Sequence, residues 1–405
     1  MKRPFTALWS ASVFLLSTLC PLPSFAGGPP PRDLATPEAR RLKGGDASEY
    51  WDLNIELEQG YRVFARFLIT NEGPGKQNGT AVGHVISPSG KTTQFRNGRL
   101  ESGWELSRDG LDLDIGRSHL DLHAGMYKLK VNKSDAMIRF HFAPNALFTV
   151  PKTVTGKNYR VDLLALGAAT SGTIQVKGMA TPVSLRGRTT ATHTVSKTAE
   201  TDVNIRRTEF VFQPLEMAAQ NESALYVSSF LSPRGKRTRW LAALKPDCDQ
   251  AFVAAPVNPA TKSPAGAVET ATKAPNSQCV RKIEARSGFD LVPGHAKNPP
   301  SSKIGSKSYW IPPVFSLQER LQGKGGEGEI KLGERILRHK PLDDLPGPIR
   351  FIAGLRTKPR RIWSTAEFDV RLPPSLDTNQ SQFKPNQFQG QGVATVSFLN
   401  PVPRP

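Results

Sequence analysis

The fold class is decided by two adjacent runs, YWDLNIEL at residues 50–57 and YRVFARFLIT at residues 61–70. Both runs are rich in aromatic and β-branched residues, and Glu58-Gln59-Gly60 joins them as a turn. Shorter runs follow, each ended by a turn signal: Pro88-Ser89-Gly90, Asn97-Gly98, Arg108-Asp109-Gly110 and Ala124-Gly125. Regular strand–turn–strand spacing without a convincing helix is typical of antiparallel sheets that roll into barrels.

The same pattern continues along most of the 405 residues. We expect a first β-rich unit over residues 48–181 and a second over residues 182–372. A Pro/Gly-rich, basic leader over residues 27–47 has the composition of a disordered segment, and a Pro/Gln/Asn-rich tail covers residues 373–405. The fold class predicted is all-β, with two tandem antiparallel barrels and little helix beyond a short one at residues 349–355, which Pro348 would begin.

The first 26 residues have the features of a signal peptide. Lys2 and Arg3 precede an apolar run over residues 5–20, and small residues end the segment at Ala26. The run is too short for a confident membrane span. Lipidation at Cys20 is an alternative to cleavage after Ala26. We therefore expect an exported protein, periplasmic or extracellular.

Removal of that segment leaves Cys248 and Cys279 as the cysteines of the mature chain. In an exported protein such a pair is expected to form a disulfide. Between them, residues 254–277 are rich in Ala, Pro, Thr and Lys and are expected to form a flexible loop.

The charge is strongly positive, with 54 Lys and Arg against 35 Asp and Glu and a formal net charge of +19. Basic clusters lie at residues 234–239 and 356–361. For an exported protein, an anionic membrane surface or polysaccharide is a more accessible partner than nucleic acid, which we do not expect. The alternative is that these charges only keep the protein soluble.

The best candidate for acid–base chemistry is the run SHLDLH at residues 118–123. On a strand, His119, Asp121 and His123 would share one face, because alternate side chains point the same way. The two histidines would be about 13 Å apart, too far to bind one metal ion together. Asp121 could hold an imidazole in one tautomer, as general acid–base catalysis needs. The simpler interpretation is a hydrogen-bonded polar row, and we predict no metal.

Other candidate residues are isolated in the sequence. His84 lies on an otherwise apolar strand, where a buried and satisfied histidine is the simpler interpretation, and His193 lies among polar β-formers. Tryptophans are more often part of a core or of the closed end of a barrel than of a ligand site. The candidate ligand-binding residues are Trp51, Phe67, His84, Trp104 and Trp240. Since the chain carries no phosphate-binding glycine loop, zinc-binding cysteine set or other cofactor motif, we predict no cofactor.

The order of several short segments resembles a known group. It is similar to the tandem lipocalin-like (calycin) superfamily that contains carotenoid 1,2-hydratases (hydroxyneurosporene synthases) and survival-factor-type lipid proteins. The resemblance covers most of residues 48–372, and it is carried by residues 70–75, 79–83, 95–98, 118–123, 183–194 and 224–241. It implies two lipocalin-like barrels and an apolar ligand such as an isoprenoid or a long-chain lipid.

The resemblance is weaker for activity. In the hydratase branch, the second barrel begins with a His-Asp-His-type signature, and here only His193 matches it. Three hypotheses follow. The first is a carrier for a hydrophobic small molecule held inside a barrel. The second is a hydratase or cyclase that protonates an isoprenoid-like alkene, with Asp121, His119, His123 and His193 as candidate catalytic residues. The third is an envelope module that binds anionic glycolipid or polysaccharide through its basic surface.

Overall fold

The computed structural model describes residues 36–45, 47–71, 76–123, 125–145, 148–149, 159–197, 206–215, 223–231, 237–247, 280–287, 289–293, 314–319, 326–344, 360–372 and 386–398. The chain divides into residues 1–32 and 33–405, and every described residue belongs to the second unit. The expected signal peptide, the cysteine pair Cys248 and Cys279, the loop at residues 254–277 and the short helix at residues 349–355 lie outside the described residues.

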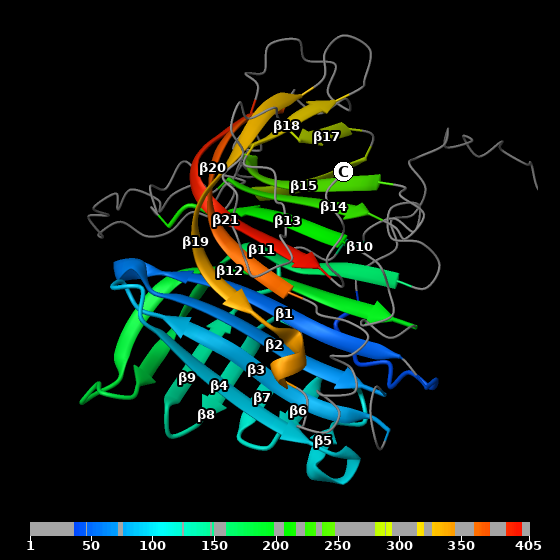
Figure 1. Cartoon of the computed structure of the whole chain (residues 1–405), viewed down its shortest axis with the longest axis vertical. Helices are drawn as coiled ribbons and strands as arrows, with labels where there is room; N and C mark the ends of the chain where they lie inside the picture. Colours follow the sequence, from blue (N-terminus) through cyan, green and yellow to red (C-terminus); the bar gives the residue numbers. More distant parts are fainter. Residues whose placement is uncertain are drawn as a thin grey trace, which may run out of the picture. The chain divides into compact units, whose positions relative to one another are not determined.

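Within the described residues, twelve strands form a first antiparallel sheet (Figure 1). Its path runs β4-β3-β2-β1-β12-β11-β9-β8-β7-β6-β5, and β10 pairs with β11. Because β6 also contacts β3 and β4, the sheet curls into a nearly closed barrel. The strands are β1 (Ser48–Leu57), β2 (Arg62–Thr70), β3 (Asn78–Ile86), β4 (Thr92–Arg99), β5 (Trp104–Leu106), β6 (Asp112–Ile115), β7 (Ser118–Asp121), β8 (Tyr127–Asn132), β9 (Ala136–Phe142), β10 (Phe148–Thr149), β11 (Tyr159–Val176) and β12 (Val183–Ser196).

Nine further strands in the described part form a second antiparallel sheet, which is an open half-barrel. Its order is β16-β15-β14-β13-β21-β20-β19-β18-β17. The strands are β13 (Arg206–Phe212), β14 (Ala224–Leu231), β15 (Arg237–Asp247), β16 (Val280–Ser287), β17 (Phe289–Pro293), β18 (Val314–Glu319), β19 (Glu327–His339), β20 (Arg360–Leu372) and β21 (Asn386–Phe398).

Helical structure in the described residues is limited to three 3₁₀ turns, η1 (Glu58–Gly60), η2 (Glu101–Gly103) and η3 (Pro341–Asp344). The predicted all-β, lipocalin-like fold class is therefore confirmed, with a half-barrel as its second sheet. Among the described residues, no helix has the length and apolarity needed to cross a membrane.

The turn between β1 and β2 forms where the sequence predicts it. Gln59 and Gly60 both adopt positive φ, 59° and 78°, which lets the chain reverse within three residues. The predicted turn at Asn97-Gly98 is wrong, because both residues lie inside β4. Asn97 is buried there and donates a hydrogen bond to Ser118 Oγ of β7 at 2.5 Å, so its amide serves the interior instead of a turn.

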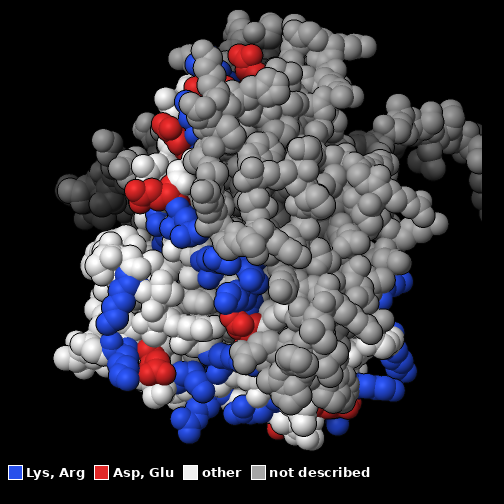
Figure 2. Space-filling view, in the orientation of Figure 1, with Lys and Arg blue, Asp and Glu red and all other residues white. Residues whose placement is uncertain are grey.

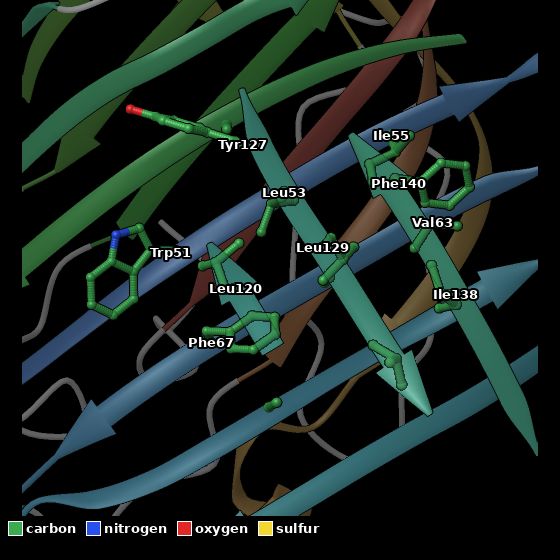
Figure 3. Packing of buried hydrophobic residues seen from close by; sticks show 14 of the residues in the cluster. Trp51, Leu53, Ile55, Val63, Phe67, Leu120, Tyr127, Leu129, Ile138 and Phe140 are labelled. Atoms are coloured by element: carbon green, nitrogen blue, oxygen red, sulfur yellow. The ribbon is translucent and has the colours of Figure 1, made fainter. Parts of the chain in front are cut away.

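Alternation along the strands fills the interior of the first sheet. In β8 and β9 every second residue is buried, and the buried positions join those of β1 and β2 in one continuous cluster. Figure 3 shows side chains from β1 and β2 and from β7–β9 converging on the same space: Trp51, Leu53, Ile55, Val63, Phe67, Leu120, Tyr127, Leu129, Ile138 and Phe140. Burial of each such side chain stabilises the fold by about 1.5–3 kcal/mol. This interior is packed with protein side chains.

Two further apolar clusters involve the second sheet. One lines its own interior, with Phe210, Phe315 and Phe368 among its members. The other joins β11 of the first sheet to β13, β14 and β15 of the second, and it contains Tyr159, Tyr226 and Trp240. The outward face of β11 is therefore covered by apolar side chains of the second sheet.

Three segments differ from the expected organisation. The sequence predicts that residues 183–196 open the second unit, whereas β12 pairs with β1 and β11 of the first sheet. It predicts at most an edge strand near residues 392–398, whereas β21 lies inside the second sheet between β13 and β20. It predicts a disordered leader, whereas residues 36–45 make hydrogen bonds to the first sheet.

Positive charge is widespread on the surface. On the face drawn in Figure 2, Lys and Arg are more widely distributed than Asp and Glu over the described residues. One member of the basic cluster at residues 356–361 is not part of that surface, because Arg361 is buried in an ion pair with Asp52.

Candidate functional site

His119, Asp121 and His123 lie on the outer side of the first sheet. Leu120 and Leu122, which alternate with them, belong to the buried cluster inside it. His119 lies between Asp112 and Asp114, with its ring nitrogens 3.1 and 2.9 Å from their carboxylates. The predicted common face is therefore present, but it points away from the apolar interior.

The electrostatics of Asp121 suit a surface ion network. Burial raises the pKa of Asp121, but hydrogen bonds from Lys128 and His123 outweigh this and lower it to about 2. The Lys128 ammonium is 2.8 Å and the His123 Nδ1 2.7 Å from the carboxylate. The hydrogen bond to Asp121 in turn raises the pKa of His123. A general acid that protonates an alkene would need its pKa shifted the other way.

Three other candidates from the sequence meet at one end of the first barrel. Trp51 on β1 is directly opposite Phe67 on β2 and His193 on β12, so all three side chains share the inner face. The Trp51 and His193 rings are stacked, with centroids 4.6 Å apart and planes 3° from parallel. Both rings are almost fully buried.

A carboxylate that the sequence analysis missed completes this group. Glu49 Oε1 lies 2.9 Å from His193 Nε2, while Thr36 O lies 2.7 Å from His193 Nδ1. Since the carbonyl of Thr36 can only accept, the hydrogen bond between them is donated by Nδ1–H of His193. Glu49 is two residues before Trp51, so strand alternation alone would have placed it on the same face.

Residues 36–45 cover this end of the barrel. The backbone N–H of Arg40 donates to both Glu49 carboxylate oxygens at 2.9 Å, and Trp51 Nε1–H donates to the Pro37 carbonyl at 3.0 Å. Asp162, which is directly opposite His193 on β11, accepts a 3.3 Å hydrogen bond from the Thr36 N–H. The polar side chains at this end are therefore satisfied by the chain's own backbone.

Trp104 and Trp240 have structural surroundings. Trp104 packs in the interior of the first sheet, and its Nε1–H donates to the Gln77 carbonyl at 2.6 Å. Trp240 is buried in the cluster that joins the two sheets and packs edge-to-face on Tyr226. Neither is among the residues that line the pocket described next.

His84 lines a small pocket between the outer face of β1–β3 and the second sheet. The pocket spans about 410 Å³, including the space at its opening to solvent. The lining residues are Asp52, Leu53, Asn54, Phe64, Ala65, Arg66, Val82, Gly83, His84, His339, Pro341, Arg361 and Trp363.

One wall of the pocket is aromatic. Phe64 and Trp363 stack with ring centroids 5.0 Å apart, and the His84 and His339 rings lie edge to face at 5.2 Å. Burial lowers the pKa of His84 to about 3, and the nearby charges of His339 and Arg361 add to this effect. His84 is therefore neutral at physiological pH and offers one hydrogen-bond donor and one acceptor.

The pocket lining also contains an ion network, whose Arg361 guanidinium lies over the Trp363 ring at 4.9 Å from its centroid. Asp52 receives two bidentate pairs, from Arg66 at 2.7 and 2.9 Å and from Arg361 at 2.9 and 2.9 Å. Burial raises the pKa of Asp52, but the two guanidinium groups lower it well below the usual range of a carboxyl. With two guanidinium groups on one carboxylate, the network carries a net positive charge at the pocket.

Two residues that line the pocket have a buried polar atom without a hydrogen-bond partner among the described residues. These atoms are the indole Nε1 of Trp363 and the guanidinium Nε of Arg361. Such a group is rare in a folded protein and is often matched by a water or a ligand. Within the described part of the chain, no group of three or more His, Cys, Asp and Glu side chains could hold a metal ion.

Neither a family model nor a curated protein matches the sequence. Solved structures are similar in fold. A protein from Nitrosomonas europaea provisionally assigned as AttH has a TM-score of 0.52 and 11% identity, over 94% of this chain and 99% of that one. Kievitone hydratase from Nectria haematococca has a TM-score of 0.51 and 11% sequence identity, over 91% of this chain and 94% of that one. CghA, solved with Sch210972, has a TM-score of 0.51 and 9% sequence identity, over 88% of this chain and 90% of that one. These similarities show a shared lipocalin-like barrel fold.

Proposed function

We propose that this protein binds a small amphipathic molecule in the pocket between its two sheets. The observation that carries the proposal is that Trp363, a residue that lines this pocket, has a buried Nε1 without a hydrogen-bond partner among the described residues. A ligand with an acceptor oxygen would satisfy this donor. Leaving such a group unpaired costs about 1–3 kcal/mol, which becomes available to binding.

The pocket suits a ligand with one polar end. Phe64, Trp363 and Val82 offer apolar and aromatic surface, while neutral His84 can donate or accept one hydrogen bond. The polar end of the ligand would lie against His84 and Trp363, and its apolar remainder would extend toward the opening of the pocket. This differs from a lipid held inside a barrel, because the interior of the first sheet is filled by its own side chains.

The fold is compatible with this function. CghA, which has the same fold, was solved with the small molecule Sch210972. That similarity, at 9% identity, supports ligand binding by the fold and leaves the ligand of this chain open. We also propose that the protein is exported, because residues 1–26 have the features of a signal peptide.

The test is ligand binding by the full chain. Native mass spectrometry of protein purified from its own host should show a bound small molecule, and the amphipathic probe 1-anilinonaphthalene-8-sulfonate should compete with it. Trp363→Phe keeps the ring and removes the N–H, so we expect the probe to bind about five- to tenfold more weakly. Trp240→Phe, which removes a buried N–H outside the pocket, is the matched control. Empty protein with no probe binding, or equal weakening in both variants, would contradict the proposal.

A second candidate function is general-acid catalysis on an isoprenoid-like alkene, and Glu56 favours it. Burial raises the pKa of Glu56 to about 7, against smaller opposing effects of Arg62 and Gln213. Asn54, which lines the pocket, is two residues away on the same face, about 7 Å along the strand. A carboxyl group that keeps its proton near neutral pH can protonate a substrate.

This second function predicts turnover that depends on a protonated Glu56. Incubation with isoprenoid alkenes should yield a product heavier by one water or a cyclised isomer, both detectable by mass spectrometry. Glu56→Gln should lower turnover at least a hundredfold, because general acid catalysis contributes about 10²–10⁴ in rate, while probe binding remains. Undiminished turnover in Glu56→Gln would exclude this role for Glu56.

A further inference from the structure

Strands β8 and β9 present a cationic outer face. Their buried and exposed positions alternate without interruption, so Lys128, Lys130, Arg139 and His141 all point outward. This follows from the two-residue period of a strand, because the alternate residues are the apolar ones that fill the interior. The outward side chains come from neighbouring strands and lie over one continuous area.

That outer face is concave. A groove of about 870 Å³ runs over β7, β8, β9 and β11 and is open to solvent. Its polar lining includes four cations, two histidines and two carboxylates: Arg117, Lys128, Lys130, Arg139, His119, His141, Asp114 and Asp121. It lies on the outer face of the first sheet, and no residue is shared with the lining of the pocket that contains His84.

The carboxylates of the groove are already paired. Asp121 is bound by Lys128 and His123, and Asp114 is 2.9 Å from His119 Nδ1. No ion pair is found in the described part of the chain for Arg117, Lys130 or Arg139. The groove therefore carries an uncompensated positive charge.

Two of these cations are placed against each other. Lys130 and Arg139 are direct cross-strand partners on β8 and β9. Directly opposed residues have Cβ atoms about 4.5–5.5 Å apart, and like charges in this position destabilise a sheet. An arrangement that works against the fold is often a sign of a functional site. An anionic group between the two cations would relieve their repulsion.

We propose that this groove binds an acidic polysaccharide. Its carboxylate or sulfate groups would pair with Lys130, Arg139 and Arg117, and its hydroxyls would find Asn132 and Thr173 in the lining. Single-stranded nucleic acid fits less well, because the lining has no exposed Trp, Tyr or Phe on which successive bases could stack, and its one Phe, Phe140, is buried. A flat bilayer fits less well, because the cations lie in a hollow.

The test compares the affinities of different polyanions for the full-length protein. Binding of heparin and polygalacturonate is measured by isothermal titration calorimetry between 50 and about 300 mM NaCl, with an oligothymidylate and phosphatidylglycerol vesicles alongside. At least one glycan should bind, with an affinity that falls as salt rises. Lys130→Glu and Arg139→Glu should each weaken this binding about tenfold or more. Lys91→Glu, an exposed lysine in the turn between β3 and β4, makes the same charge change outside the groove and should weaken it by about twofold at most.

Folding provides a second readout. Lys130→Glu replaces a like-charge pair with an opposite-charge pair, so it should raise the urea midpoint while it weakens glycan binding. The proposal is overturned if neither glycan binds at 50 mM NaCl or if Lys91→Glu weakens binding as much as Lys130→Glu. It is also overturned if the vesicles or the oligonucleotide, and not the glycans, depend on Lys130 and Arg139.

Discussion

At the scale of single residues, Glu56 makes stability depend on pH. Its folded-state pKa of about 7 lies above the ordinary 4.5, mainly because the carboxyl is buried. Between these values the folded state holds a proton that the unfolded chain has lost, so the free energy of unfolding falls as pH rises from about 4.5 to 7. The shift of roughly 2.5 pH units corresponds to about 3 kcal/mol.

Glu56→Gln removes this dependence. Relative to the wild type, the variant should gain up to about 3 kcal/mol in free energy of unfolding between pH 4.5 and pH 8. Urea denaturation at the two pH values measures the difference. Glu58→Gln, which removes an exposed carboxylate from the adjacent turn, is the matched control. The same pH-dependent gain in both variants would show that burial of Glu56 is not the cause.

Residue-level prediction from the sequence was limited by long-range contacts. Strand alternation correctly puts His119, Asp121 and His123 on one face, but it cannot say whether that face is inside or outside. The partners of His193 come from positions 144 and 157 residues earlier in the chain. His339 and Trp363, which complete the pocket around His84, are still more distant, 255 and 279 residues later in the chain, and nothing local in the sequence connects them.

At the scale of elements, Asp52 links three strands from both sheets. It joins β1 to Arg66 of β2 and to Arg361 of β20 through four hydrogen bonds. Asp52→Asn keeps the shape but removes the anion that Arg66 and the buried Arg361 share. Removal of one partner from a buried ion pair typically costs about 3–5 kcal/mol. We expect a loss of that size in the free energy of unfolding, measured by urea denaturation.

Asp114→Asn is the matched control for Asp52→Asn. Asp114 also forms an ion pair, with His119, but its side chain is 56% exposed. Exposed pairs contribute about 0–1 kcal/mol, so this variant should be nearly neutral. Similar losses in both variants would mean that burial of the Asp52 network does not set its contribution.

The strands themselves were the most predictable elements. β1 and β2 follow from their β-forming residues and from the turn at Gln59 and Gly60. β11 is a single strand of 18 residues, because register shifts and the positive φ of Gly167 let it bend without ending. Asn97-Gly98 has the sequence of a turn but lies within β4, where the buried Asn97 donates a hydrogen bond to Ser118 of β7.

At the scale of the whole molecule, sheet membership could not be predicted from order along the chain. Pro182 suggests a boundary, but β12 pairs with β1 across more than a hundred residues and closes the first sheet. β21 likewise returns from the end of the chain to the middle of the second sheet. Such pairings depend on which strand edges remain unpaired after the local hairpins form. The composition of a segment does not predict which edge it will pair with.

Residues 36–45 look like an expendable linker by composition, but their backbone supplies the hydrogen bonds that Glu49, Trp51, His193 and Asp162 need. A recombinant fragment trimmed to the first strand at Ser48 would carry four buried polar side chains stripped of these contacts. Expression boundaries, affinity tags and circular permutants of this protein should therefore leave Thr36 and everything after it intact.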